Sequence, residues 1–147
     1  TKFLCIFNAD GSFDPKYLNE MLKMCENHDY VFSSRYLKNA GSEDDTIVTK
    51  IGNFIFSTLG NLLFSVKLSD ILFTYILGKT SSFRSLNLKC KDFCLCVEIP
   101  ISAKKMNASY KDFPSYERKR IAGNKKVNEF RDGFKILIYM IKRFLNF

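Results

Sequence analysis

The residues most able to do chemistry follow the first apolar run of the chain. Phe3 to Phe7 is a short hydrophobic segment, and Asn8-Ala9-Asp10 comes directly after it. In open α/β sheets, ligands bind outside the carboxyl ends of strands, and a carboxylate placed there can hold Mg²⁺ or Mn²⁺ against phosphate oxygens. Asp10, with Asn8, is therefore a candidate metal site. A polar turn that simply ends a strand is the alternative interpretation.

Charge gives a second group of candidates. The chain has 23 Lys and Arg residues against 15 Asp and Glu residues, a net charge of +8, which favours nucleic acid, phosphorylated ligands or an anionic membrane as partners. Arg118 to Lys126 is a basic stretch around Gly123, a pattern that is also typical of a solvated surface turn. Glu98 stands in an apolar segment, either as a site carboxylate or as one half of a buried ion pair.

Composition excludes several classes of protein. The chain has 147 residues, of which 46% are hydrophobic, so a disordered segment is excluded and one folded unit is expected. Its five cysteines are an odd number at irregular spacing and lack paired C-x2-C hooks. We therefore expect free thiols in a reducing compartment, with neither a disulfide framework nor a zinc site. The longest apolar segment, Ile51 to Val66, is interrupted by Gly and Asn residues, and no transmembrane helix is expected.

The elements that would position these residues alternate in type. A strand at Phe3 to Phe7, expected in the interior of a sheet, is followed by a polar turn and by a helix that begins at Asp14-Pro15. This order predicts an α/β fold. The remaining expected elements are a strand at Tyr30 to Phe32, a helix at Thr46 to Val66 buried on more than one side, a turn at Gly78 to Ser82, a helix at Phe93 to Lys105 and an extended segment at Ala108 to Tyr116.

The last segment, Val127 to Phe147, has the pattern of a basic amphipathic helix. One broad face would carry Phe130, Phe134, Leu137, Ile138, Ile141, Phe144 and Leu145, and the other largely Arg131, Lys135, Lys142 and Arg143. Such a helix is typical of an element that lies on a membrane surface. A terminal helix that packs on its own domain fits the pattern nearly as well.

A series of short motifs extends over almost the whole chain. It consists of Phe7-Asn8-Ala9-Asp10-Gly11-Ser12-Phe13-Asp14-Pro15, Ser33-Ser34-Arg35-Tyr36, Gly52-Asn53, Ser69-Asp70, Phe93 to Ile101 and Tyr116 to Lys126. In order and approximate spacing this series resembles glycosyltransferase family 2, in the branch of the polyprenyl-phosphate (dolichol-phosphate mannose-like) sugar transferases. Two departures stand out. Asn8 replaces the first acidic residue of the D-x-D motif, and the family's first βαβ region would lie before Thr1.

The resemblance implies an A-type glycosyltransferase (nucleotide-diphospho-sugar transferase) fold. Residues 1–126 would be the C-terminal part of its catalytic domain, and residues 127–147 the amphipathic helix. Asp10 and Asn8 would hold Mg²⁺ or Mn²⁺, and Asp70 and Glu98 would be further catalytic carboxylates, although a helix cap is the alternative for Asp70. The phosphate-binding residues would be Arg35, Arg118, Arg120, Lys125 and Lys126, which suit phosphate as bidentate or point-charge partners.

The reaction implied is the metal-assisted transfer of a sugar from a nucleotide-diphosphate sugar to a polyprenyl phosphate or a related acceptor. The enzyme would be cytoplasmic and peripheral to the cytoplasmic face of a membrane. One alternative is a catalytically silent homologue that acts as a membrane-associated scaffold, for which Asn8 would be the signature. A nucleic-acid-binding domain ranks lowest, because no recognised motif accompanies the basic residues, and no nucleic acid is expected as a partner.

Overall fold

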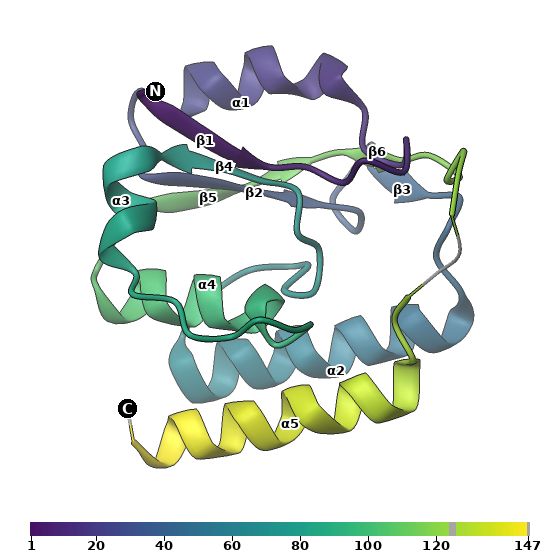
Figure 1. Ribbon diagram of the computed structural model, residues 1–147, viewed down its shortest axis with the longest axis vertical. Coiled ribbons are helices and arrows are strands. Elements are labelled where there is room, and N and C mark those ends of the chain that lie inside the picture. Colours follow the sequence, from purple (N-terminus) through teal and green to yellow (C-terminus); the bar gives the residue numbers. More distant parts are fainter. Residues whose placement is uncertain (124–125, 147) are drawn as a thin grey trace.

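In the computed structural model, which describes residues 1–123 and 126–146, a four-stranded sheet lies between helices on its two faces (Figure 1). The strand order is β1 (Phe3–Ile6), β4 (Ile76–Lys79), β2 (Tyr30–Ser34) and β5 (Tyr110–Pro114). Strand β4 is antiparallel to both β1 and β2, whereas β2 and β5 are parallel. A separate parallel pair joins β3 (Gly41–Ser42) to β6 (Tyr116–Glu117). The predicted α/β class is confirmed, with a mixed sheet.

Side chains alternate between the two faces of the sheet, and each face has its own core. On one face, Val31 and Leu77 pack with Met21 of helix α1 (Leu18–Met24), which follows a 3-10 turn at Pro15–Tyr17. On the other face, Phe32 and Ile76 pack with residues of α4 (Leu95–Lys105). Helix α3 (Thr80–Ser85) follows β4 directly. Successive residues of a strand point to opposite faces of the sheet, so a strand that is covered on both faces contributes alternate residues to two cores.

Two long helices form the outermost layer beyond α4. Helices α2 (Ile47–Phe64) and α5 (Glu129–Leu145) lie side by side, and their N-terminal ends are at the same end of the molecule (Figure 1). Helix α2 begins with a capping box, in which Thr46 and Thr49 each accept a hydrogen bond from the other's backbone N–H. Helix α5 begins at Asn128, whose side chain accepts from Arg131 N at 2.9 Å.

Most of the predicted elements are confirmed. The helix that begins at Asp14-Pro15, the strand at Tyr30 to Phe32, the helix at Phe93 to Lys105 despite Pro100, and the extended segment at Ala108 to Tyr116 all have counterparts. The five cysteines are free, as expected.

The expectation that Gly78 to Ser82 forms a turn was wrong. Gly78 lies inside β4, and Thr80 begins α3. A Cβ at Gly78 would lie 2.6 Å from the Tyr30 ring and 2.8 Å from the Asp29 carbonyl oxygen. Gly78 is therefore required by close approach of the neighbouring strand and not by a turn.

The first strand was predicted in the interior of the sheet, but in the described residues it lies at an edge. In the described residues, β1 pairs with β4 alone, and its other edge carries no partner strand. Leu4 and Phe7 are correspondingly about two-fifths exposed. An apolar strand with an open edge is unusual, because unpaired N–H and C=O groups invite another strand.

The expectation for α2 was right in its extent and wrong in its burial. The helix buries Asn53, Ser57, Gly60 and Phe64, while most of its large apolar residues are exposed. By length and composition α2 is also apolar enough to cross a membrane, which the sequence analysis had not expected.

Candidate functional site

A groove with a volume of about 1330 Å³ opens between the carboxyl end of β1 and the N-terminal parts of α2 and α5. Its polar residues come from several segments, among them the loops after β1, after β2, before α2 and after β6. They include Asn8, Asp10, Arg35, Asp44 and Arg120. Its apolar residues come from the two helices, from the segment before β4 and from the start of α4. The groove therefore combines a charged region with an apolar one.

Asp10 lies in this groove in a turn that holds its carboxylate in place. Asp10 Oδ1 accepts hydrogen bonds from Ser12 N at 3.0 Å and Ser12 Oγ at 2.6 Å, and Oδ2 lies 3.6 Å from Arg120 Nη1. Partial burial alone would raise the pKa of Asp10, but the Ser12 hydrogen bonds and the Arg120 charge outweigh it and lower this pKa below its usual value. Asp10 is thus held as a carboxylate.

Arg120, in the loop after β6, joins Asp10 to the loop before α2. Its Nε donates to Asp44 Oδ1 at 3.2 Å, and Nη2 donates to Asp44 Oδ2. The backbone also brings the two segments together, because Ile121 N donates to Asp10 O at 2.8 Å. Residues far apart in the sequence therefore form an Asp10–Arg120–Asp44 cluster in the groove, and this cluster was not predicted as a unit.

Arg35 is the centre of a second, more deeply buried cluster. Its Nε and Nη2 donate to the two oxygens of Asp70 at 2.8 and 3.0 Å, and its Nη1 donates to Glu117 Oε2 at 3.2 Å. The guanidinium also lies 4.6 Å from the centre of the Phe73 ring. Arg35 reaches the wall of the groove, but the Asp70 side chain is fully buried. The fork of Arg35 is therefore filled by carboxylates of the chain itself.

The segment that carries Asp70 is tied to the sheet. Ser69 donates to Asp112 Oδ2 from its backbone N at 2.9 Å and from Oγ at 2.7 Å. Burial raises the pKa of Asp112, although the hydrogen bonds from Ser69 oppose the shift. These contacts fix the position of Asp70, and through it the position of Arg35.

Glu98 lies apart from the groove. Its two oxygens accept hydrogen bonds from Lys89 N at 3.0 Å and Cys90 N at 2.8 Å. Glu98 is buried in the first turn of α4 and holds the preceding loop against this helix. The structure thus gives Glu98 a role that neither interpretation from the sequence included, and it does not bring Glu98 together with Asp10.

The predicted phosphate-binding residues are divided. Arg120 and Lys126 line the groove. Arg118 points to the cap of the first helical turn, where its Nη2 lies 3.2 Å from Asp14 Oδ1. Lys125 falls outside the described residues. The structure therefore places two of the four residues from the basic stretch in the same groove as Asp10.

A metal ion would have few protein ligands here. Within residues 1–123 and 126–146, no group of three His, Cys, Asp or Glu residues could hold one. Asp10 is nonetheless a fixed carboxylate at the wall of a groove, and Asn8 lines the same wall. Oxygen ligands of this kind suit Mg²⁺ or Mn²⁺ when phosphate oxygens and water complete the coordination.

Three site residues escaped the sequence analysis. Asp44, Asp45 and Glu117 belong to the two clusters, and Arg35 Nη1 lies 3.8 Å from Asp45 Oδ1. The acidic loop Asn39 to Asp45 was visible in the sequence. Nothing in its composition indicated which basic residue each carboxylate would face.

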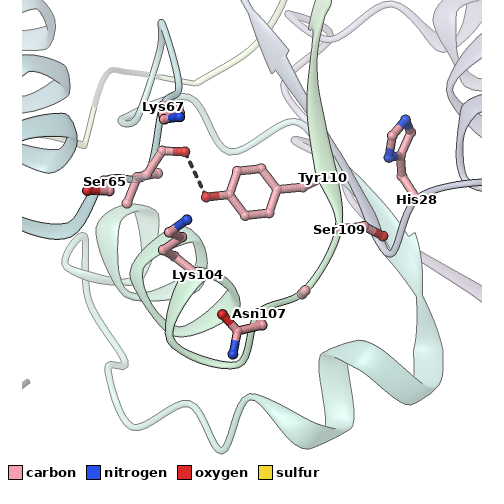
Figure 2. Close-up of a pocket in the computed structure, with 9 residues that line it drawn as sticks. His28, Ser65, Lys67, Lys104, Asn107, Ser109 and Tyr110 are labelled. Carbon is pink, nitrogen blue, oxygen red and sulfur yellow. Dashed lines mark hydrogen bonds between the residues drawn. The ribbon is translucent and has the colours of Figure 1, made fainter.

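A second, smaller cavity of about 400 Å³ lies at the C-terminal ends of α2 and α4 (Figure 2). Lys67, Lys104 and His28 line it, and Tyr110 Oη donates to Val66 O at 2.7 Å across one wall. Among the residues that the structure describes, none of those predicted to do chemistry lines this cavity.

The chain was also compared with known protein families, and no family model matches it.

Proposed function

We propose that the chain is part of a glycosyltransferase that moves a sugar from a nucleotide-diphosphate sugar to a lipid phosphate. One observation carries the proposal: Asp10 and Arg120 converge at the carboxyl end of β1, in a groove that also has an apolar region. Both substrates would carry phosphate, and the acceptor would carry a lipid chain as well. The resemblance to family 2 supports the same reaction.

In this proposal the chain contributes mainly position and charge. The acceptor phosphate oxygen attacks the anomeric carbon of the sugar, the bond from that carbon to the diphosphate breaks, and the nucleoside diphosphate leaves. A phosphate oxygen is already anionic, so the step needs orientation and charge neutralisation more than a strong base. Arg120 and Lys126 would bind phosphate oxygens in the groove.

Asp10, with Asn8, would hold Mg²⁺ or Mn²⁺. When bound, such an ion neutralises charge on the diphosphate leaving group. Asp10 suits this role because its carboxylate is ionised and held by Ser12. The loss of a second carboxylate at Asn8 would weaken metal binding, since a neutral amide oxygen attracts the ion less.

Arg35 and Asp70 take a different role in the proposal from the one the sequence indicated. Because the Arg35 guanidinium and the Asp70 carboxylate hydrogen-bond to each other, we assign them as positioning residues that hold the wall of the groove. Glu98 and Arg118 lie outside the proposed site.

The proposed A-type glycosyltransferase fold also gives a use to the open edge of β1. In the resembled family a βαβ region precedes the metal-binding strand. Strands of such a region would pair with the edge of β1 that is unpaired in the described residues. The nucleotide base would then bind at the carboxyl ends of those strands.

The test is metal-dependent transfer by the full-length protein with Asp10→Ala. We expect the loss of at least about 100-fold in rate, the scale of removing one charge-stabilising group. Asp14→Ala is a matched control, because Asp14 is an aspartate of the same loop that caps a helical turn outside the groove. Equal activity of the Asp10→Ala variant would remove Asp10 from the site.

A second variant separates the enzyme from a silent homologue. If Asn8 merely weakens metal binding, Asn8→Asp should lower the metal concentration needed for transfer. Absence of transfer in both the natural protein and Asn8→Asp would favour a scaffold.

A further inference from the structure

Helix α2 presents its apolar side to solvent. Ile51, Phe54 and Leu62 are 56%, 73% and 75% exposed, and Ile47, Val48 and Ile55 are also exposed. Scattered exposed apolar residues are normal, but a continuous face of this kind on one helix marks an interaction surface.

The inward side of α2 is the polar one. Asn53 Nδ2 and Ser57 Oγ each donate to Ser69 O at 3.3 Å. Gly60 packs so closely that a Cβ there would lie 2.5 Å from Ile71 Cδ1. A helix of a water-soluble domain normally has the opposite arrangement. Because the polar side is fixed to the domain, the outward direction of the apolar side is built into the fold.

Helix α5 extends the exposed apolar face. It buries Asp132, Ile136 and Met140, whereas Phe130, Phe134, Ile141, Phe144 and Leu145 are exposed. The rings of Phe64 in α2 and Phe144 in α5 meet edge to face with centroids 6.0 Å apart. The exposed apolar residues of the two adjacent helices therefore form one area, the α2–α5 surface.

The charges of the two helices favour an anionic partner. Helix α2 contains no acidic residue and one basic residue, Lys50, which is exposed. On α5, Arg131, Lys135 and Lys142 are exposed, and the two acidic residues are the half-buried Glu129 and the buried Asp132. Arg131 and Lys135 pair with Asp132 at 3.2 and 3.9 Å, which leaves the helix with more basic than acidic charge on its exposed side. Lys and Arg side chains close to a bilayer are attracted to the negative surface of anionic lipid. A second protein would have to cover the same apolar area and match the same positive charge.

We propose that the α2–α5 surface docks on an anionic lipid bilayer, with both helices in the plane of the membrane. The exposed Ile, Phe and Leu side chains enter the boundary between headgroups and acyl chains, and the lysines and arginines contact the headgroups. Helix α2 lies on the bilayer and does not cross it, because Asn53 and Ser57 bind it to the domain. The inference rests on the exposed faces and their charge, and not on transferase activity.

Docking in this direction has a consequence for the groove. The groove opens between the N-terminal parts of the same two helices, and its lining includes Ile51, Ile55, Phe130 and Phe134. Its apolar region is therefore continuous with the membrane-facing area.

The experiment is co-sedimentation of the 147-residue chain with vesicles of phosphatidylcholine, with and without phosphatidylserine, at low and high salt. Leu62→Asp removes one exposed leucine of the α2–α5 surface. Leu4→Asp is a matched control with the same change in charge, at an exposed leucine on β1. Because burial of a leucine side chain in an apolar environment is strongly favourable, we expect Leu62→Asp to lower the affinity about tenfold or more. Leu4→Asp should bind as the unaltered chain does. Circular dichroism checks that both variants fold.

Four results would overturn the proposal. The first is that the unaltered chain stays in the supernatant with anionic vesicles at low salt, and the second is that Leu62→Asp binds as well as Leu4→Asp. Bound protein that resists extraction at alkaline pH would show a helix that crosses the bilayer. If instead the chain sediments as a dimer that Leu62→Asp dissociates, without vesicle binding, a second copy covers the surface. No sugar donor or acceptor is present in this assay, so failure of the proposed transferase activity would leave its result unchanged.

Discussion

Replacing Arg35 by methionine tests the buried cluster most directly. The substitution keeps much of the side-chain volume but removes the donors to Asp70 and Glu117, two of which bind Asp70 at 2.8 and 3.0 Å. The Asp70 side chain is fully buried, and that of Asp45, near the same guanidinium, is 1% exposed. Arg35→Met therefore leaves a group of buried carboxylates without its central cation.

The expected cost follows from that geometry. Removing one partner of a buried ion pair costs about 3–5 kcal/mol, because the remaining charge cannot return to water. A chain of this size has a free energy of unfolding of roughly 5–15 kcal/mol, so Arg35→Met should lose a large part of it. Arg35→Lys keeps the charge but not the fork that binds both oxygens of Asp70, and we expect a smaller loss.

Urea unfolding followed by circular dichroism measures these losses as shifts in midpoint at constant slope. In the double variant with Arg35→Met and Asp70→Leu, no charge at position 70 is left uncompensated, and we expect at least about 2 kcal/mol to be regained. A loss below about 1 kcal/mol for Arg35→Met would refute the reasoning, since an exposed ion pair contributes no more than that.

Three further predictions concern stability. Met140→Ala should cost about 2–5 kcal/mol in urea unfolding, because Met140 is fully buried between helices and its loss leaves a cavity. Thr46→Ala should cost about 1 kcal/mol in the same assay, through loss of the hydrogen bond from Thr49 N at 3.2 Å, with the exposed Thr58 as a control position. Asp112→Asn should gain stability relative to the unaltered chain as pH rises above about 4, because the raised pKa of Asp112 makes its ionisation in the folded chain unfavourable. The measurement is the free energy of unfolding of the unaltered chain and of Asp112→Asn at several pH values. A difference between the two that does not change with pH would contradict this last prediction.

The parts of the fold that could be predicted depend on local chemistry. Asp14-Pro15 combines a capping side chain with a residue that favours the first helical position, and the helical turn begins there. The strand at Tyr30 is β-branched and aromatic and is buried on both faces. Asp10 was identified because a strand must deliver the residue that follows it to the edge of the sheet.

The parts that could not be predicted depend on contacts between distant segments. The space that requires glycine at Gly78 is occupied by Tyr30 of the next strand, and only the pairing of β2 with β4 reveals it. Arg35 was predicted to bind phosphate, yet the carboxylates of two residues far away in the sequence bind it instead. Periodicity showed that α2 is a helix with a broad apolar side, but it could not show which side faces the core.

The hydrogen bonds from α2 to Ser69 have a further consequence for how the molecule opens. Asn53 and Ser57 share the Ser69 carbonyl oxygen, and Ser57 Oγ also accepts from Ile71 N at 3.1 Å. The middle of α2 and the segment around Asp70 therefore cannot separate without breaking the same few bonds. In amide hydrogen exchange the two should open as one cooperative unit, so that the slowest-exchanging amides of α2 and those of Ser69 and Ile71 report a common opening free energy.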